Sequence, residues 1–507
     1  MSRSDMFIPE KTLDIGIFKK VHSTLENLKN IAPSKQFQST TNYFERRRMN
    51  NENKSVTSSP DRRRFLKTSM GLAIAGAGTM IFPNTVSAEP MATGFSGHNS
   101  DRKLWDKVRK EFVLNKRTTY MNIGTTGSMP KDVLKRYNDN NEMIAKDPWQ
   151  TSVSTIDLAK QVAPDFGADG HELVLSRNTT DGLNSIINGL QFEAGDVILT
   201  THHEHGGAKT PLDHVSERYG VDVIEIEIPV YTGGDMITQD DFVNAFADAV
   251  AEHGSRVRLI VFSHITYTTG TTLPAERICK EVAIPNRIPT LIDGAHTTGM
   301  LNLNFHDIDC DFYAGSGHKW QCGAGATGFL YIRNDARRLA RFWNDRDTPL
   351  WCINSSSSST ELQAKFQSIG QDHYPAKQAL VDSCAMWEEI GRDVIEARIL
   401  DLSELCKLEL VAAFPDAPLY APNTRNLSSG LTTFNPFYDQ YDGVLLTEFR
   451  DRLREEYGYI IRTTNFKVKA DDVQNRQALR ISTHLFHNGD DVKGLVKSMA
   501  RLFRDMS

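Results

Sequence analysis

Apolar runs alternate with amphipathic segments through the middle of the chain. Short, β-rich apolar runs predict strands at 172–176, 196–201, 221–228, 258–265, 289–296, 310–316 and 327–333. Between these runs, apolar residues recur at helical spacing, as at 178–190 and 239–253, and a further helix is expected from Pro274. Buried strands that alternate with helices predict an α/β fold with a mostly parallel, mixed sheet that helices cover on both faces.

The pattern changes near Tyr374, where the sequence becomes helical and then continues as a shorter α+β stretch. We therefore expect a large domain at 115–372 and a smaller C-terminal α+β domain at 373–507. Residues 89–114 are interpreted as a linker or arm, and the serine-rich stretch 355–360 as a surface loop. The chain has 507 residues, 39% of them hydrophobic, which is enough for a core of this size.

The first hundred residues differ from the rest. RRRFLK at 62–67 is followed by the mild apolar run GLAIAGAGTMIF and by small residues that end at Ala88. Twin arginines, an apolar run and a small-residue cleavage site predict a Tat signal peptide at 49–88. The run is too short and too rich in glycine to span a bilayer. The alternative is a basic patch ahead of a buried helix.

This signal predicts folded export by the Tat translocase, cleavage near Ala88 and a periplasmic protein without a membrane anchor. Such signals usually begin near the initiator, so we interpret residues 1–48 as a non-native or disordered extension. Translation would then begin at Met49.

Charge and cysteine content narrow the function classes. The net charge of -6 does not indicate binding to nucleic acid or to an anionic membrane. No two of the six cysteines have CxxC spacing, so we interpret them as buried free thiols.

Three histidines crowd into THHEHGG at 201–207. A zinc site needs three or four convergent ligands, whereas adjacent residues at the end of a strand point apart. A metal site is therefore the less favoured interpretation, and we interpret His202 and His203 as ordinary strand-end or loop residues.

Two motifs lie where predicted strands end. IDGAH contains Asp293 and His296, and DFYAGSGHKW contains Ser316, His318 and Lys319. Because ligands of open α/β sheets bind at the carboxyl ends of strands, we expect the aspartate and the lysine at one edge of the sheet.

These motifs, in this order, resemble the class V aminotransferases, which are pyridoxal phosphate (PLP) enzymes of fold type I. The resemblance covers nearly all of the chain after about residue 115. It implies a PLP cofactor, with Lys319 forming the Schiff base and then moving the substrate α-proton. Asp293 would pair with the pyridine N–H. The alternatives are a solvated lysine at a strand end and an aspartate that pairs with an arginine.

The same resemblance implies further cofactor contacts. Ser316 and His318 would hold the phosphate together with Thr179 or Thr180, which open a predicted helix whose N-terminus favours anions. Taken alone, such a threonine pair is usually a helix cap. His205 would stack on the cofactor ring.

His296 would lie near the cofactor's phenolic oxygen, and this histidine resembles the isopenicillin N epimerase-like branch of the family. Tyr267 is expected near the same oxygen.

The C-terminal part resembles the family's substrate-binding region. Arg480 would bind the substrate α-carboxylate, and a structural ion pair is the alternative. Gln371 replaces a threonine that reaches the partner's phosphate in the family, which predicts a homodimer. Residues 461–477 contain no cysteine, so cysteine desulfuration is disfavoured. QCGAGATG at 321–328 lacks a proline common in relatives, which leaves the local loop geometry open.

We therefore expect a PLP enzyme acting on the α-amino group of an amino acid or a peptide-borne amine, by transamination, epimerisation or oxidative decarboxylation. Alternatives within the family are an isopenicillin N epimerase-like racemase and an enzyme that tailors a glutamyl residue of a pyoverdine-type siderophore. Alternatives from other classes are a non-catalytic binding protein on the same scaffold and a metallohydrolase that uses the histidine cluster.

Overall fold

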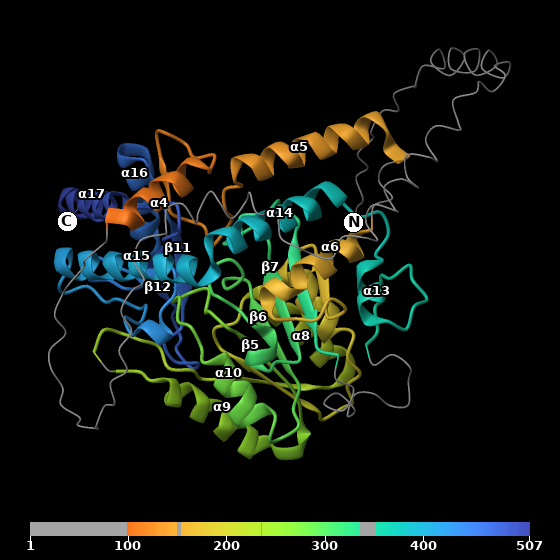
Figure 1. The fold of residues 1–507 in the computed structure, drawn as a ribbon. Helices are drawn as coiled ribbons and strands as arrows, with labels where there is room; N and C mark the ends of the chain where they lie inside the picture. Colours follow the sequence, from red (N-terminus) through yellow and green to blue (C-terminus); the bar gives the residue numbers. More distant parts are fainter. Residues whose placement is uncertain (1–98, 150–153, 235, 335–349, 507) are drawn as a thin grey trace, which may run out of the picture. The chain divides into compact units, whose positions relative to one another are not determined.

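The computed structural model describes residues 99–149, 154–234, 236–334 and 350–506, which belong to one compact unit (Figure 1). The predicted extension at 1–48 and the predicted signal peptide at 49–88 lie outside the described residues.

A seven-stranded sheet lies in the larger part of this unit, with strand order β2-β8-β7-β6-β5-β3-β4. Its strands are β2 (Leu173–Ser176), β3 (Val197–Thr201), β4 (Asp222–Ile226), β5 (Val257–Ser263), β6 (Thr290–Gly294), β7 (Phe312–Ser316) and β8 (Gly328–Ile332). Of the seven strands, β8 runs antiparallel to both neighbours, and the other pairs are parallel. The structure thus confirms the predicted α/β fold with a mostly parallel, mixed sheet.

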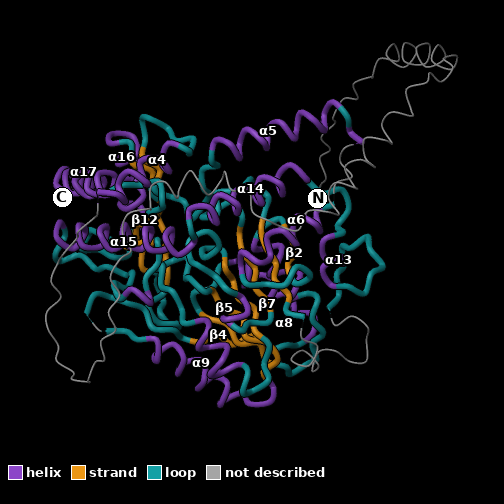
Figure 2. Tube along the Cα trace, in the orientation of Figure 1, coloured by secondary structure: helices purple, strands orange, loops and turns teal. Residues whose placement is uncertain are grey.

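Helices cover the sheet on both faces (Figure 2). Apolar residues of α7 (Thr179–Ile187) and α8 (Gly206–Tyr219) pack in one core cluster. Residues of α6 (Thr155–Val162) and α9 (Gln239–His253) pack in another. The central strands are buried along almost their whole length, which explains why they read as continuous apolar runs.

The remaining α-helices complete the described chain. They are α4 (Asn99–Lys110), α5 (Lys131–Lys146), α10 (Ala275–Arg277), α11 (Phe305–Ile308), α13 (Leu362–Gln367), α14 (Tyr374–Ile390), α15 (Arg392–Ala413), α16 (Gly443–Tyr457) and α17 (Gly489–Met506). Within the described residues, none of the helices combines the length and the apolar character needed to cross a bilayer.

A second, antiparallel sheet lies in the C-terminal part, with strand order β11-β12-β9. It consists of β9 (Leu431–Phe434), β11 (Arg462–Phe466) and β12 (Arg476–Ser482) and shares an apolar core with α15, α16 and α17. A short parallel pair, β1 (Thr119–Tyr120) with β10 (Tyr459–Ile460), links the two ends of the described chain. The domain boundary between residues 372 and 373 stays a prediction.

The parallel strands place several polar residues at one edge of the large sheet. Ser263 at the end of β5 is paired with Asp293 of β6, and Asp293 is paired with Ala314 of β7. Strand β3 also ends at this edge, because it pairs in parallel with β5. Residues that follow β3, β5, β6 and β7 therefore meet where ligands bind in open α/β sheets.

Candidate active site

Lys319 lies in the turn that follows β7. Its side chain is partly buried, and burial lowers the pKa of its amine to about 8, with Asp293 opposing that shift. In the part of the chain that the structure describes, its Nζ makes no hydrogen bond. An amine with a lowered pKa and no acceptor is available for chemistry.

Asp293, at the end of β6, is only 5% exposed. Its Oδ1 accepts a hydrogen bond of 2.8 Å from the N–H of Ala295. Burial raises the pKa of this carboxyl, while the Ala295 N–H, Lys319 and His205 oppose the rise. A buried carboxylate of this kind is stabilised by a cationic N–H partner.

His205 is the N-cap residue of α8. Its Nδ1 accepts from the N–H of Gly207 at 3.0 Å, so the neutral ring carries its proton on Nε2. Its exposed ring lies edge-on to Tyr267, with centroids 5.1 Å apart. The helix cap thus fixes the orientation of the ring.

The neighbouring histidines have other partners. His203 Nε2 lies 2.7 Å from the carbonyl oxygen of Lys467, and His202 Nδ1 lies 3.4 Å from that of Ile226. Across the described ranges, the residues whose ligand atoms gather closely enough for a metal are elsewhere: Asp169, Glu172 and His306. The three histidines do not converge on one point.

Glu204 connects the ends of β3 and β5, a role that the sequence did not indicate. It is buried and accepts hydrogen bonds from the Thr201 hydroxyl at 2.6 Å and from the Ser263 N–H at 2.9 Å. Burial raises the pKa of its carboxyl to about 7. These bonds hold the strand end from which His205 follows.

The N-termini of α7 and α8 lie side by side. A Cβ atom on Gly207 would lie 2.7 Å from Oγ1 of Thr180, so this approach requires a residue without a side chain. Oγ1 of Thr179 is buried and has no hydrogen-bond partner among the described residues. Two helix N-termini and an unpaired hydroxyl form a favourable environment for an anion.

Ser316 and His318 already have partners in the chain. The Ser316 hydroxyl donates to the carbonyl oxygen of Ala295 at 2.8 Å, and His318 Nδ1 lies 3.4 Å from that of Thr327. Gln371 is exposed between α13 and α14, and within the described ranges it has no hydrogen bond to the other predicted site residues. Its predicted contact requires a second copy of the chain and stays a prediction.

His296 is buried and receives a hydrogen bond that the sequence did not reveal. The Trp320 indole N–H donates to its Nδ1 at 3.2 Å. Because indole can only donate, the neutral imidazole must carry its proton on Nε2. Burial lowers the pKa of His296 well below its usual value, so the ring stays neutral. Trp320 therefore selects one tautomer of His296.

Arg480 lies on β12 and is 2% exposed. Its Nη1 donates to the carbonyl oxygen of Tyr267 at 2.8 Å, while Nε and Nη2 have no partner among the described residues. Burial and the charge of Arg462 lower its pKa. A buried guanidinium with two unused N–H groups favours a carboxylate ligand.

The loop at 321–328 adopts an unusual backbone conformation. Cys322 and Ala326 have φ angles of 55° and 56°, in the left-handed region. The Cys322 thiol is buried 3.3 Å from Nε2 of His484, and burial raises its pKa far above the ordinary value. This thiol is therefore protonated and not a nucleophile.

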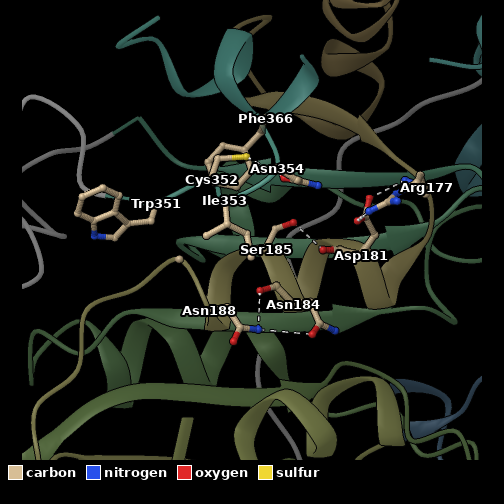
Figure 3. A pocket seen from close by; sticks show the side chains of 11 residues that line it. Arg177, Asp181, Asn184, Ser185, Asn188, Trp351, Cys352, Ile353, Asn354 and Phe366 are labelled. Atoms are coloured by element: carbon tan, nitrogen blue, oxygen red, sulfur yellow. Dashed lines mark hydrogen bonds and ion pairs between the residues drawn. The ribbon is translucent and has the colours of Figure 1, made fainter. Parts of the chain in front are cut away.

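A separate surface cavity lies beside α7 (Figure 3). Its polar residues pair with one another: Arg177 with Asp181, and Asn188 Nδ2 with the carbonyl oxygen of Asn184. Trp351 forms part of the wall. The cavity contains none of the predicted site residues.

Comparison with known proteins gives a consistent result. A family profile described as "Aminotransferase class-V" matches residues 126–495. Isopenicillin N epimerase from Streptomyces clavuligerus is 28% identical over 344 residues, which cover 65% of this chain and 84% of that protein. Isopenicillin N epimerase from Amycolatopsis lactamdurans is 26% identical over 411 residues, which cover 78% of this chain and 98% of that protein.

A solved structure has the same fold. The structure of C-DES with glycine covalently linked to the PLP cofactor has a TM-score of 0.63 at 22% identity, covering 77% of this chain and 98% of that chain. At this identity the similarity supports the fold alone.

Proposed function

The chain belongs to the class V aminotransferase family, and from this premise we propose that it is a PLP-dependent enzyme acting on the α-amino group of an amino acid or a peptide-borne amine. One observation carries the proposal. The unbonded amine of Lys319 and the buried carboxylate of Asp293 occur together at the carboxyl edge of the sheet and act on each other electrostatically.

The residues present fit this cofactor. The unpaired hydroxyl of Thr179 lies where the N-termini of two helices favour a phosphate. Asp293 would accept a hydrogen bond from the ring nitrogen, His205 would cover the ring face, and His296 would donate from Nε2 to the phenolic oxygen. The phosphate would be held by Thr179 and Thr180 of α7, and Ser316 and His318 would join them by exchanging their present partners, the carbonyl oxygens of Ala295 and Thr327.

When bound, PLP withdraws electron density from the substrate α-carbon and weakens the bonds there. Lys319 would remove or return a proton at that carbon, and a pKa of about 8 leaves a useful share of the amine unprotonated near neutral pH. Arg480 would bind the α-carboxylate through its free Nε and Nη2 and so fix which α-bond is aligned for cleavage. Asp293 would hold the proton on the ring nitrogen.

Transamination, epimerisation and oxidative decarboxylation all use this set of residues. Epimerisation is the second candidate, because two isopenicillin N epimerases align over most of their length. Tailoring of a siderophore glutamyl residue is a further alternative. Cysteine desulfuration is disfavoured because residues 461–477 contain no cysteine and the Cys322 thiol is buried and protonated.

The test is a spectroscopic and product assay on the purified protein. We expect a visible absorption band that changes when substrate amino acids are added. In deuterated water, epimerisation exchanges the α-hydrogen and inverts the centre, transamination yields an oxo acid, and decarboxylation releases carbon dioxide. A protein that stays colourless after incubation with excess PLP would contradict the proposal.

We also propose that the enzyme is exported folded through the Tat translocase and that cleavage occurs near Ala88. The sequence order at 62–88 supports this proposal. Replacing Arg62 and Arg63 with lysine should retain the protein in the cytoplasm. An intact mass of the exported form that includes residues before Ala88 would contradict the cleavage site.

Finally, we propose a homodimer in which Gln371 reaches the partner's phosphate site. A monomeric mass in solution at micromolar concentration would contradict it.

A further inference from the structure

Two arginines lie side by side on neighbouring strands of the C-terminal sheet. Arg462 of β11 is directly opposite Arg480 of β12 in the antiparallel register. Side chains of directly opposed residues emerge on the same face of a sheet, and like charges in this position repel. The pair is therefore unfavourable for folding unless an anion compensates it.

The described chain supplies no such anion. Arg462 Nη1 contacts the Thr125 hydroxyl at 3.3 Å, and among the described residues no carboxylate forms an ion pair with either arginine. Arg462 is exposed, whereas Arg480 is buried. One guanidinium thus lies inside the site and the other at its solvent-facing side.

Arg462 acts on the site electrostatically. Its charge contributes to lowering the pKa values of Lys319 and Arg480 and of two histidines, His205 and His296. It is therefore near the groups to which the proposed function assigns proton transfer, the ring face, the phenolic oxygen and the substrate α-carboxylate.

We propose that Arg462 binds a second anionic group of the substrate, so that the preferred substrates are amino acids, free or peptide-borne, whose side chain carries a carboxylate. This inference rests on the proposed function, because Arg480 is assigned to the α-carboxylate and Asp293 to the cofactor. The second guanidinium is then left to recognise the side chain by charge-assisted hydrogen bonds.

The experiment compares L-glutamate with L-glutamine, which differ in charge and hardly in shape. Each is titrated into the PLP-loaded enzyme while the visible absorption is followed. We expect glutamate to bind about 10- to 100-fold more tightly, the range for one hydrogen bond between charged groups. Arg462→Gln should remove this preference by weakening the binding of glutamate much more than that of glutamine, and Arg462→Lys should keep part of the preference.

Arg476→Gln is the matched control. This substitution removes the same charge as Arg462→Gln. Arg476 lies on the same strand as Arg480, but its guanidinium packs over the ring of Tyr441. It should keep the wild-type preference for glutamate.

A second measurement does not depend on cofactor chemistry. Binding of glutarate, a dicarboxylate without an amine, is measured by calorimetry with the wild type and with Arg462→Gln. We expect weaker binding by the variant. A protein without a visible band would contradict the proposed PLP function. Glutarate binding would still test whether Arg462 and Arg480 together bind a dicarboxylate.

The inference is overturned if a coloured enzyme binds glutamate no more tightly than glutamine or shows no detectable glutamate binding. It is also overturned if Arg462→Gln weakens both ligands equally.

Discussion

Two lysines of this protein, one partly and one fully buried, have similar acidity and different surroundings. Burial lowers the pKa of Lys319, after β7, to about 8, and that of Lys407, in α15, to about 7. Lys407 is 1% exposed, and its Nζ donates to the Pro422 carbonyl oxygen and the Ser428 hydroxyl. The Nζ of Lys319 has no such bond in the described structure and lies near Asp293. A lowered pKa alone therefore does not identify a reactive amine, whereas a nitrogen without an acceptor beside a carboxylate does.

The largest expected effect comes from replacing each lysine in turn. Lys319→Ala should abolish the visible band and all activity, because no other described amine occupies the site. Lys407→Met should keep the band at full intensity, since its nitrogen is engaged elsewhere. Absorption spectra of both variants after incubation with PLP test this comparison. A normal band in Lys319→Ala would contradict it.

The carboxylate beside Lys319 gives the next largest effect. Asp293→Asn keeps the size of the side chain but removes the charge that would hold the ring-nitrogen proton. Losing one partner of a buried ion pair costs about 3–5 kcal/mol, so PLP affinity or turnover should fall about 100-fold or more. Equilibrium dialysis measures the loss of PLP affinity, and steady-state rates measure the loss of turnover. Asp196→Asn is a control, because Asp196 pairs with Arg258 where β3 and β5 begin, at the strand ends opposite to the site.

The motifs at the strand ends made the fold and the central pair of the candidate site predictable from the sequence. Lys319 and Asp293 follow apolar runs, and parallel strands bring their ends to one edge, so their proximity could be inferred from the sequence. The contact of Trp320 with His296 could not, because it depends on how two turns fold over each other. The opposition of Arg462 and Arg480 depends on the register of a hairpin, which the pattern of apolar residues does not fix.

The second lysine gives a smaller effect, on stability. The folded-state pKa of Lys407 is about 7, compared with 10.5 for the unfolded chain. Between these values the unfolded state binds more protons, so this group makes stability rise with pH by up to about 1.4 kcal/mol per unit. Below pH 7 both states are protonated, and the cost of burying the charge is fully present.

Lys407→Met should lose this pH dependence, which denaturant unfolding at several pH values between 7 and 10 will show. Methionine leaves two buried acceptors without donors, at about 1–3 kcal/mol each, so the variant is expected to be less stable than the wild type at high pH. The slope with pH is therefore the diagnostic quantity. An unchanged slope would mean that Lys407 is charged in the folded state.

The smallest expected effect concerns the tautomer of His296. Trp320→Phe removes the N–H that fixes the proton on Nε2, at a cost of about 0.5–1.5 kcal/mol, so PLP affinity should fall about 3- to 10-fold. Nitrogen chemical shifts of His296 in the cofactor-free protein should show a mixture of tautomers. Trp387→Phe is the matched control, because the buried Trp387 indole donates to the Gly299 carbonyl oxygen at 2.9 Å. If both variants change PLP affinity equally while His296 keeps one tautomer, Trp320 only supports packing.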